Sequence, residues 1–299
     1  MAARRIPPEE LFDPEFLASL AALRIVARRV VPRGRHADHR SKDLGGGLEF
    51  KDYRPYAAGD DLRSVDWNIY RRLGRVFLRL FEEQEDLPLY LLPDVSESAW
   101  LEQPPRARAG LRAALALGAI SLNQHDRVGI FPFADDLEVA VRPRAGKRRV
   151  LQFADELAKL EPGGRTDFRR AMRTFGHLKL REGLVAIVSD FFDPSGVVAV
   201  VDALQALRHK LVLVQLVRAT DADPDLSGDV RLVDCETGEG EDVSVTPTVR
   251  EGYRRAYAAF NEHLTRFAAS RRVGLLRLDV EQPVVPQLAE LFEGGRLAV

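Results

Sequence analysis

From residue 89 onward, short hydrophobic runs alternate with stretches whose hydrophobic positions recur every three or four residues. Runs without polar alternation are typical of parallel strands buried on both faces, and the intervening periodicity is typical of amphipathic helices. The predicted strands are 89–93, 128–133, 184–189, 210–217 and 274–278, with a short antiparallel edge strand at 137–141. The predicted helices are 104–123, 147–160, 168–178, 195–208 and about 249–271. This alternation predicts an α/β fold with a doubly wound, mainly parallel sheet covered on both faces.

The region before residue 85 has a different pattern. Asp13-Pro14-Glu15 is typical of a helix start, with an acid as N-cap and proline in the first turn, and Leu17 and Leu20 follow at helical spacing. Residues 33–47 are predicted to form an exposed, basic loop. Residues 48–84 are rich in aromatic, β-favouring and turn residues, and their clearest strand is 76–81.

We therefore predict two domains. The first, residues 1–84, contains the N-terminal helix, the basic loop and a small β-rich subdomain. The second, residues 85–299, is the α/β domain, with an excursion near 219–247 where Asp, Gly and Glu are frequent.

Composition narrows the class of protein. Hydrophobic residues make up 45% and charged residues 30% of the 299 positions, as expected for a globular chain. The net charge of −1 argues against a general nucleic-acid or membrane-surface binder. Cys235 is the only cysteine, which excludes intramolecular disulfides and cysteine-rich zinc sites. Because no signal-peptide core and no run of about 20 apolar residues occurs, we expect a cytoplasmic protein without a membrane span.

Three segments of the predicted α/β domain end in oxygen-bearing side chains. The first strand runs directly into Asp94-Val95-Ser96-Glu97-Ser98, and the strand at 184–189 runs into Asp190. Between them, a glycine-containing loop places Thr166 just before a helix. In open α/β sheets, ligands bind beyond the carboxyl ends of the strands, where the strand order reverses. We therefore expect these segments to meet at one crevice.

The predicted ligands are hard oxygen donors that suit Mg²⁺ or Mn²⁺. They are Asp94, Ser96, Ser98, Thr166 and Asp190. With only two carboxylates, the charge of a divalent ion is at most balanced, so the ion would remain electrophilic with an open position. A carboxylate from a partner protein would complete the coordination shell, and metal and partner would bind cooperatively.

Each segment also has a purely structural interpretation. Asp-x-Ser-x-Ser is common in turns and N-caps, Thr166 is a suitable N-cap, and Asp190 would suit the start of the following helix. Another alternative is a Mg²⁺-dependent phosphohydrolase with Asp94 as nucleophile. Such chemistry needs a second carboxylate two residues later, and Ser96 stands there instead. No Walker-type loop is present, so the chain is not expected to hydrolyse ATP itself. We expect a binding protein and not an enzyme. A structural domain whose site never fills with metal remains the third alternative.

The five residues together resemble the metal-ion-dependent adhesion site of von Willebrand factor type A domains. That site consists of Asp-x-Ser-x-Ser, a Thr in a glycine-containing loop and an Asp at a later strand end. The resemblance implies that Ser96, Ser98 and Thr166 ligate a metal ion directly. It implies that Asp94 and Asp190 ligate it directly or through water.

A second resemblance lies upstream. Glu49-Phe50, Tyr53-Arg54-Pro55-Tyr56, Gly59-Asp60-Asp61 and Arg63-Ser64-Val65-Asp66-Trp67 resemble the signature of bacterial domain-of-unknown-function family 58, a likeness that extends to Asp234-Cys-Glu-Thr-Gly238. Many members of that family join this signature to a von Willebrand factor A-type domain and work with MoxR-type AAA+ ATPases in chaperone-like assembly or activation systems. The resemblance therefore implies an adaptor or scaffold whose partner is such an ATPase, its client protein, or both.

Two further groups of polar residues carry weaker signals. Asp60, Asp61, Arg63 and Asp66 form either an ion-pair network that fixes the β-rich subdomain to the α/β domain or a partner-docking face. His36 and His39 are candidate metal ligands, but they lack a third ligand and lie in the basic loop, so we interpret them as solvated.

Overall fold

The computed structural model describes residues 6–20, 23, 48–57, 60–62, 65–83, 87–124, 126–146 and 149–293. His36, His39 and Arg63 lie outside this part of the chain. The chain divides into two compact units, one of residues 1–34 with 87–299 and one of residues 35–86. None of the described helices is long and apolar enough to cross a bilayer.

The larger unit is built on a six-stranded sheet in the order β10-β7-β6-β3-β4-β5. All neighbouring pairs are parallel except β4 and the edge strand β5. The bounds are β3 Leu89–Pro93, β4 Val128–Ile130, β5 Val141–Arg144, β6 Leu184–Ser189, β7 Lys210–Val217 and β10 Gly274–Asp279. The chain leaves β3 in one direction and returns to β6 on its other side, so the strand order reverses between these two strands. The predicted doubly wound, mainly parallel sheet is confirmed.

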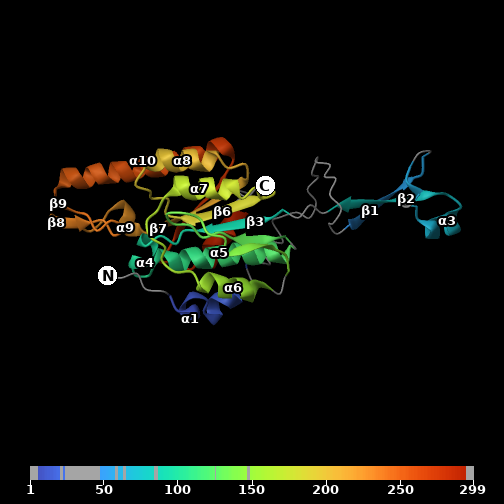
Figure 1. Ribbon diagram of the computed structural model, residues 1–299, viewed down its shortest axis with the longest axis horizontal. Helices are drawn as coiled ribbons and strands as arrows, with labels where there is room; N and C mark the ends of the chain where they lie inside the picture. The colour runs from blue at the N-terminus through green and yellow to red at the C-terminus, as the bar shows by residue number, and fades with distance from the viewer. Residues whose placement is uncertain are drawn as a thin grey trace. The chain divides into compact units, whose positions relative to one another are not determined.

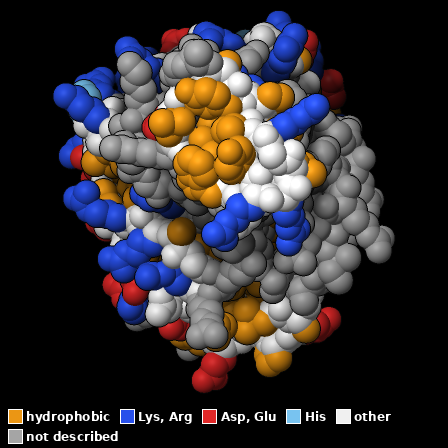
Figure 2. Space-filling view, turned by 90° about the vertical axis from the view of Figure 1, so that its right-hand side faces the viewer, with side chains coloured by type: hydrophobic (Ala, Val, Ile, Leu, Met, Phe, Trp, Pro, Cys, Tyr) orange, Lys and Arg blue, Asp and Glu red, His pale blue; other side chains and the backbone are white. Residues whose placement is uncertain are grey.

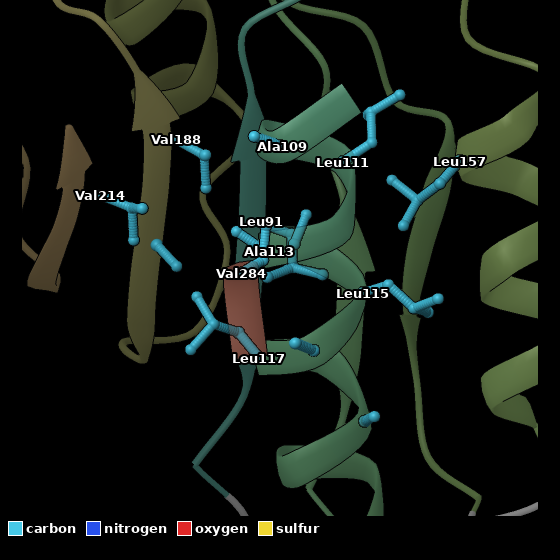
Figure 3. Close-up of a cluster of buried hydrophobic side chains, with 14 of the residues drawn as sticks. Leu91, Ala109, Leu111, Ala113, Leu115, Leu117, Leu157, Val188, Val214 and Val284 are labelled. Carbon is cyan, nitrogen blue, oxygen red and sulfur yellow. The ribbon is translucent and has the colours of Figure 1, made fainter. Parts of the chain in front are cut away.

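Helices cover both faces of this sheet (Figure 1). Adjacent residues on each strand point to opposite faces, so Leu91 and Val188 belong to one core and Leu92 and Ile187 to the other. The helices of the first core are α1 Pro8–Leu11, α4 Ser98–Leu101, α5 Arg106–Asn123, α6 Val150–Ala158 and α11 Val284–Glu293. The helices of the second core are α7 Phe168–His177, α8 Val197–Gln205 and α10 Pro247–Arg271. Figure 3 shows the first core, with Leu91, Val188 and Val214 facing the alanine- and leucine-rich surface of α5.

The N-terminal segment packs on the larger unit, whereas we had grouped it with the β-rich subdomain. A helix at residues 14–20 follows Asp13, whose carboxylate accepts a hydrogen bond from Phe16 N at 2.8 Å, as the N-cap prediction required. Leu11 and Phe16 are buried in the first core. Arg112 of α5 donates to Leu11 O at 2.7 Å and forms an ion pair with Asp13. Burial of these hydrophobic side chains explains why this segment belongs to the α/β unit.

The excursion after β7 contains α9 Ala219–Ala222 and an antiparallel hairpin. The hairpin strands are β8 Gly228–Val233 and β9 Gly240–Val245, and Val233 pairs with Gly240 next to the turn. Thr246 then caps α10 by accepting a hydrogen bond from Val249 N, so this helix begins at Pro247, earlier than predicted.

The smaller unit pairs β1 Leu48–Pro55 with β2 Phe77–Glu83 in antiparallel fashion and contains α3 Trp67–Leu73. Asp66 caps α3, and Asp60 forms an ion pair with Arg54 of β1 at 2.6 Å. These contacts join elements within the small unit. The helix α3 exposes Trp67 and Leu73. Figure 2 shows a group of hydrophobic side chains with Lys and Arg side chains around it.

Candidate functional site

The ends of β3 and β6 lie side by side at the point where the strand order reverses. Pro93 pairs with Val188 in parallel register, and Asp94 N donates to Val188 O at 2.9 Å. Asp94 therefore leaves β3 next to Ser189, the last residue of β6, and Asp190, which follows it. This is the edge of the sheet at which we predicted the site.

The carboxylate of Asp94 is held by two hydrogen bonds in a buried position. Asp94 is only 6% exposed. Oδ1 accepts from Ser96 N at 2.9 Å, and Oδ2 accepts from Ser189 Oγ at 2.5 Å. Burial raises the pKa of Asp94, although both hydrogen bonds favour the charged form.

The two serines of the Asp94 loop are not helix caps. The residue at the N-cap of α4 is Glu97, and no side chain caps this short helix. Ser96 is buried, and its Oγ lies 3.1 Å from Ser98 Oγ. Both hydroxyl groups are therefore gathered at one place, which the capping interpretation does not explain.

The glycine-containing loop is attached to the Asp94 loop by its backbone. Gly163 N donates to Val95 O and Glu97 N donates to Gly164 O, both at 2.8 Å. Gly164 has a φ of 72°, which favours glycine at this position. Thr166, which is 7% exposed, and Ser98 donate to the same carboxylate oxygen, Glu236 Oε1, at 3.1 and 2.9 Å. Asp167, and not Thr166, caps α7 by accepting from Arg170 N, so the threonine hydroxyl is available to the site.

Asp190 is the second acid of the site, and its side chain is 14% exposed. Burial, followed by the negative charge of Asp94, raises the pKa of Asp190 to about 7. Its Oδ1 accepts from Phe192 N at 3.0 Å, and Arg106 Nε lies 3.7 Å from Oδ2. It does not cap α8, whose N-cap is Gly196 without a side-chain cap. The helix-cap alternative for Asp190 is therefore not observed.

The turn after Asp190 is strained and supported by aromatic packing. Phe191 has a φ of 65°, a left-handed conformation that bulky residues rarely adopt. The ring is fully buried and lies 5.6 Å from Phe168, which in turn packs against Phe133 at 5.0 Å. Its N–H donates to Ser189 Oγ at 2.9 Å. Strain of this kind is retained where the surroundings impose it, often at functional sites.

Sequence reasoning missed three residues that contact the site. Ser189 donates to Asp94, and Arg106 pairs with Asp190. The third is Glu236, from the turn between β8 and β9, whose carboxylate accepts hydrogen bonds from Ser98 and Thr166. The turn composition of Asp234–Gly238 indicates a hairpin tip, but no local pattern indicates which strand ends this tip reaches.

Arg106 also links Asp190 to α9, the short helix that precedes the β8–β9 hairpin. Its guanidinium makes two hydrogen bonds to the carboxylate of Asp221 in α9, at 2.5 and 2.9 Å. Although burial opposes the charged form, these bonds and the charge of Asp190 raise the pKa of Arg106 above its ordinary value. The buried guanidinium of Arg106 thus pairs both with Asp190 and with Asp221, which lies in the segment that leads to Glu236.

The donor set fits a hard divalent cation. Hydroxyl and carboxylate oxygens are the ligands that Mg²⁺ and Mn²⁺ prefer. Burial raises the pKa of both acids, so a cation bound beside them would stabilise their charged forms. Within the described residues, no group of three or more His, Cys, Asp or Glu side chains could hold a metal ion. The candidate site is of another kind, because three of its five predicted ligands are hydroxyl groups.

Comparison with known proteins gives a family match over most of the chain. The sequence profile described as "Protein of unknown function DUF58" matches residues 52–263. "Uncharacterized protein Rv1480" of Mycobacterium tuberculosis (strain ATCC 25618 / H37Rv) is 26% identical over 293 residues, which cover 96% of this chain and 92% of the relative. A shorter relative, "Uncharacterized protein MAV169" of Mycobacterium avium, is 26% identical over 135 residues, 45% of this chain and 79% of that protein.

Solved structures match the larger part of the chain at low scores. BatB from Bacteroides thetaiotaomicron has a TM-score of 0.41 at 14% identity and covers 70% of this chain and 98% of its own. Manganese-loaded TRAP protein from Plasmodium vivax has a TM-score of 0.37 at 16% identity and covers 70% of this chain and 74% of its own. Likeness at this level carries no argument, so the architecture rests on the sheet itself.

Proposed function

The chain belongs to the family described as protein of unknown function DUF58, and we propose that it is a protein-interaction module that binds an acidic group of a partner through a divalent cation. One observation carries the proposal. The side chains predicted as ligands come from three segments far apart in the sequence, and they lie at the switch point of the sheet. Their residue types are those that a hard cation requires.

The charge of the site supports a partner acid as the missing ligand. The two acids predicted as ligands, Asp94 and Asp190, balance at most the charge of one divalent ion. Three neutral hydroxyls supply oxygen ligands without adding charge, so a bound Mg²⁺ would stay electrophilic and attract a further carboxylate. A nucleophilic role for Asp94 would need a second carboxylate two residues later as general acid, and Ser96 stands there instead. We therefore propose binding and not catalysis.

The proposed partner is a MoxR-type AAA+ ATPase or its client protein, acting together with this chain in a chaperone-like assembly or activation system in the cytoplasm. This choice of partner rests on the family resemblance. The net charge of −1 favours a protein over nucleic acid as the partner.

A pull-down from the lysate of the native host tests the proposal. Wild type and Asp94→Ala are each presented with Mg²⁺ or with EDTA, and Asp155→Ala, an exposed acid on α6, is the matched control. We expect wild type and Asp155→Ala to retain an AAA+ ATPase or another protein when Mg²⁺ is present and to lose it in EDTA. Retention of the same proteins by Asp94→Ala, or in EDTA, would exclude the metal site as the contact. Circular dichroism must show that Asp94→Ala remains folded.

A further inference from the structure

The tip of the β8–β9 hairpin contacts the hydroxyl side of the candidate site. Oε1 of Glu236 accepts from Ser98 Oγ at 2.9 Å and from Thr166 Oγ1 at 3.1 Å, and Oε2 accepts from Thr166 N at 3.1 Å. Arg165 Nε donates to the main-chain oxygen of Glu236 at 3.2 Å. Two of the five predicted ligands thus already hold a carboxylate that belongs to the same chain.

The hairpin turn positions Glu236 independently of these contacts. Asp234 Oδ1 accepts from Glu236 N at 2.8 Å and from Thr237 N at 3.1 Å, and Gly238, with a φ of 73°, donates to Asp234 O at 2.8 Å. Such a turn restricts the backbone before any cation binds. The carboxylate is therefore preorganised, and little entropy is lost when it becomes a ligand.

The carboxylate of Glu236 lies close to another acid and has no ion-pair partner among the described residues. Among the described residues, it accepts hydrogen bonds from hydroxyl and amide groups but forms no ion pair. It stands beside Asp94, and its charge is among the causes that raise the pKa of that acid. A carboxylate that lies beside Asp94 and forms no ion pair of its own is stabilised if a cation binds between the two.

We infer that Glu236 is an internal ligand of the candidate cation site and takes the position that the proposed function reserves for the acid of a partner. This inference rests on the proposed function and adds a competitor to it. Glu236 completes the coordination of the cation from within the chain. The acid of a partner must therefore displace the hairpin tip before it binds. Arg106 pairs with Asp190 and with Asp221 of α9, so the site and the segment that leads to the hairpin share one buried cation.

Titration of the full chain with Mn²⁺ alone, followed by electron paramagnetic resonance of the free ion, tests the role of Glu236. The variants are Glu236→Gln, Asp94→Ala and the matched control Glu239→Gln, an exposed acid of the same turn. We expect Glu236→Gln to weaken Mn²⁺ binding about tenfold or more, since removal of even an outer-shell partner typically costs 10–100-fold. Glu239→Gln should bind as wild type does.

A second readout follows the hairpin directly. Cys235 is the only cysteine, is exposed and adjoins Glu236, so a nitroxide attached to its sulfur reports the mobility of the tip. We expect Mg²⁺ to reduce nitroxide mobility in wild type and Glu239→Gln, and to leave the mobility of Glu236→Gln unchanged at a higher value.

The outcomes separate the two proposals. If Mn²⁺ binding depends on Asp94 while Glu236→Gln matches wild type in affinity and in nitroxide mobility, the internal ligand is overturned and the proposed function stands. If wild type binds no Mn²⁺, or binds it equally well without Asp94, both are overturned. Weaker Mn²⁺ binding together with a more mobile tip in Glu236→Gln supports the internal ligand.

Discussion

At the amino end of β3, Tyr90 is 1% exposed and packs edge-on against Phe131 and Phe175, with ring centroids 5.8 and 5.7 Å away. Its hydroxyl donates to Arg181 O at 2.7 Å, so this buried polar group is satisfied. At the carboxyl end of the same strand, Asp94 is 6% exposed but is an acid beside other acids. Burial stabilises the fold at the first end and opposes the charge at the second.

This difference indicates where to look for function. Aromatic packing around Tyr90 needs no further explanation, because it removes apolar surface from water. Buried carboxylates next to a strained Phe191 are costly unless a partner or ion compensates them. The contrast within one strand is the one expected if the amino end stabilises the fold and the carboxyl end binds the proposed cation, and four variants or conditions test that expectation.

The largest effect is expected at the aromatic end. Phe175→Ala removes a buried ring that contacts Tyr90, Phe131 and His209, and we expect a loss of about 3–5 kcal/mol in the free energy of unfolding. Urea denaturation measures it. Leu151→Ala, at a position 64% exposed, is the control and should change stability little. A loss below about 1 kcal/mol for Phe175→Ala would contradict the importance of this cluster.

The next effect belongs to the carboxyl end and depends on metal. Saturating Mg²⁺ should raise the stability of wild type by about 2.7 kcal/mol at 100 times the Kd, because it binds the folded state alone. Asp94→Asn, which keeps the shape of the side chain, should lose this Mg²⁺-dependent gain and remain as stable as wild type in EDTA. Thermal unfolding with and without Mg²⁺ measures both quantities. Equal Mg²⁺ stabilisation of both proteins would place the ion elsewhere.

A third effect tests how tightly the amino ends of β3 and β6 are joined. A Cβ at Gly183 would lie 2.3 Å from Pro88 O, a backbone atom that cannot move aside without shifting the strand. We expect Gly183→Ala to destabilise the protein by about 1–3 kcal/mol in denaturant melts. Gly176→Ala in α7, where a Cβ meets no atom within 4 Å, is the matched control and should stabilise by about 0.5–1 kcal/mol. The same sign for both variants would contradict the steric argument.

The smallest effect is a pH dependence at the aromatic end. Burial lowers the pKa of His209 from its ordinary 6.5, and the charge of Glu182 opposes this shift. Because the folded pKa is the lower one, neutral His209 is compatible with the fold above pH 6.5, and stability falls as the pH decreases through that value. Relative to wild type, His209→Gln should lose less free energy of unfolding between pH 8 and pH 5. Parallel pH profiles would show that His209 does not contribute.

Continuous hydrophobic runs made the strands predictable. Both β6 and β7 have the predicted bounds. A continuous hydrophobic run indicates a strand buried on both faces from its own residues, without information on the neighbouring strands. The edge strand β5 begins where its predicted range ends, because Leu137 forms only an isolated bridge to Phe133. At the site, all predicted ligands lie at the switch point, and their metal ligation stays a prediction.

Alternation of strands and helices thus determined the architecture and, through the switch point, the edge of the sheet where polar strand ends would meet. These features depend on local periodicity and on the handedness of crossovers, which a sequence carries by itself. Only the tertiary structure decided that the N-terminal helix packs on α5, that Arg106 pairs with Asp190, and that Glu236 reaches Thr166 across 70 residues. Such contacts depend on where separate segments come to rest in space, and residue type at one position does not specify its distant neighbour.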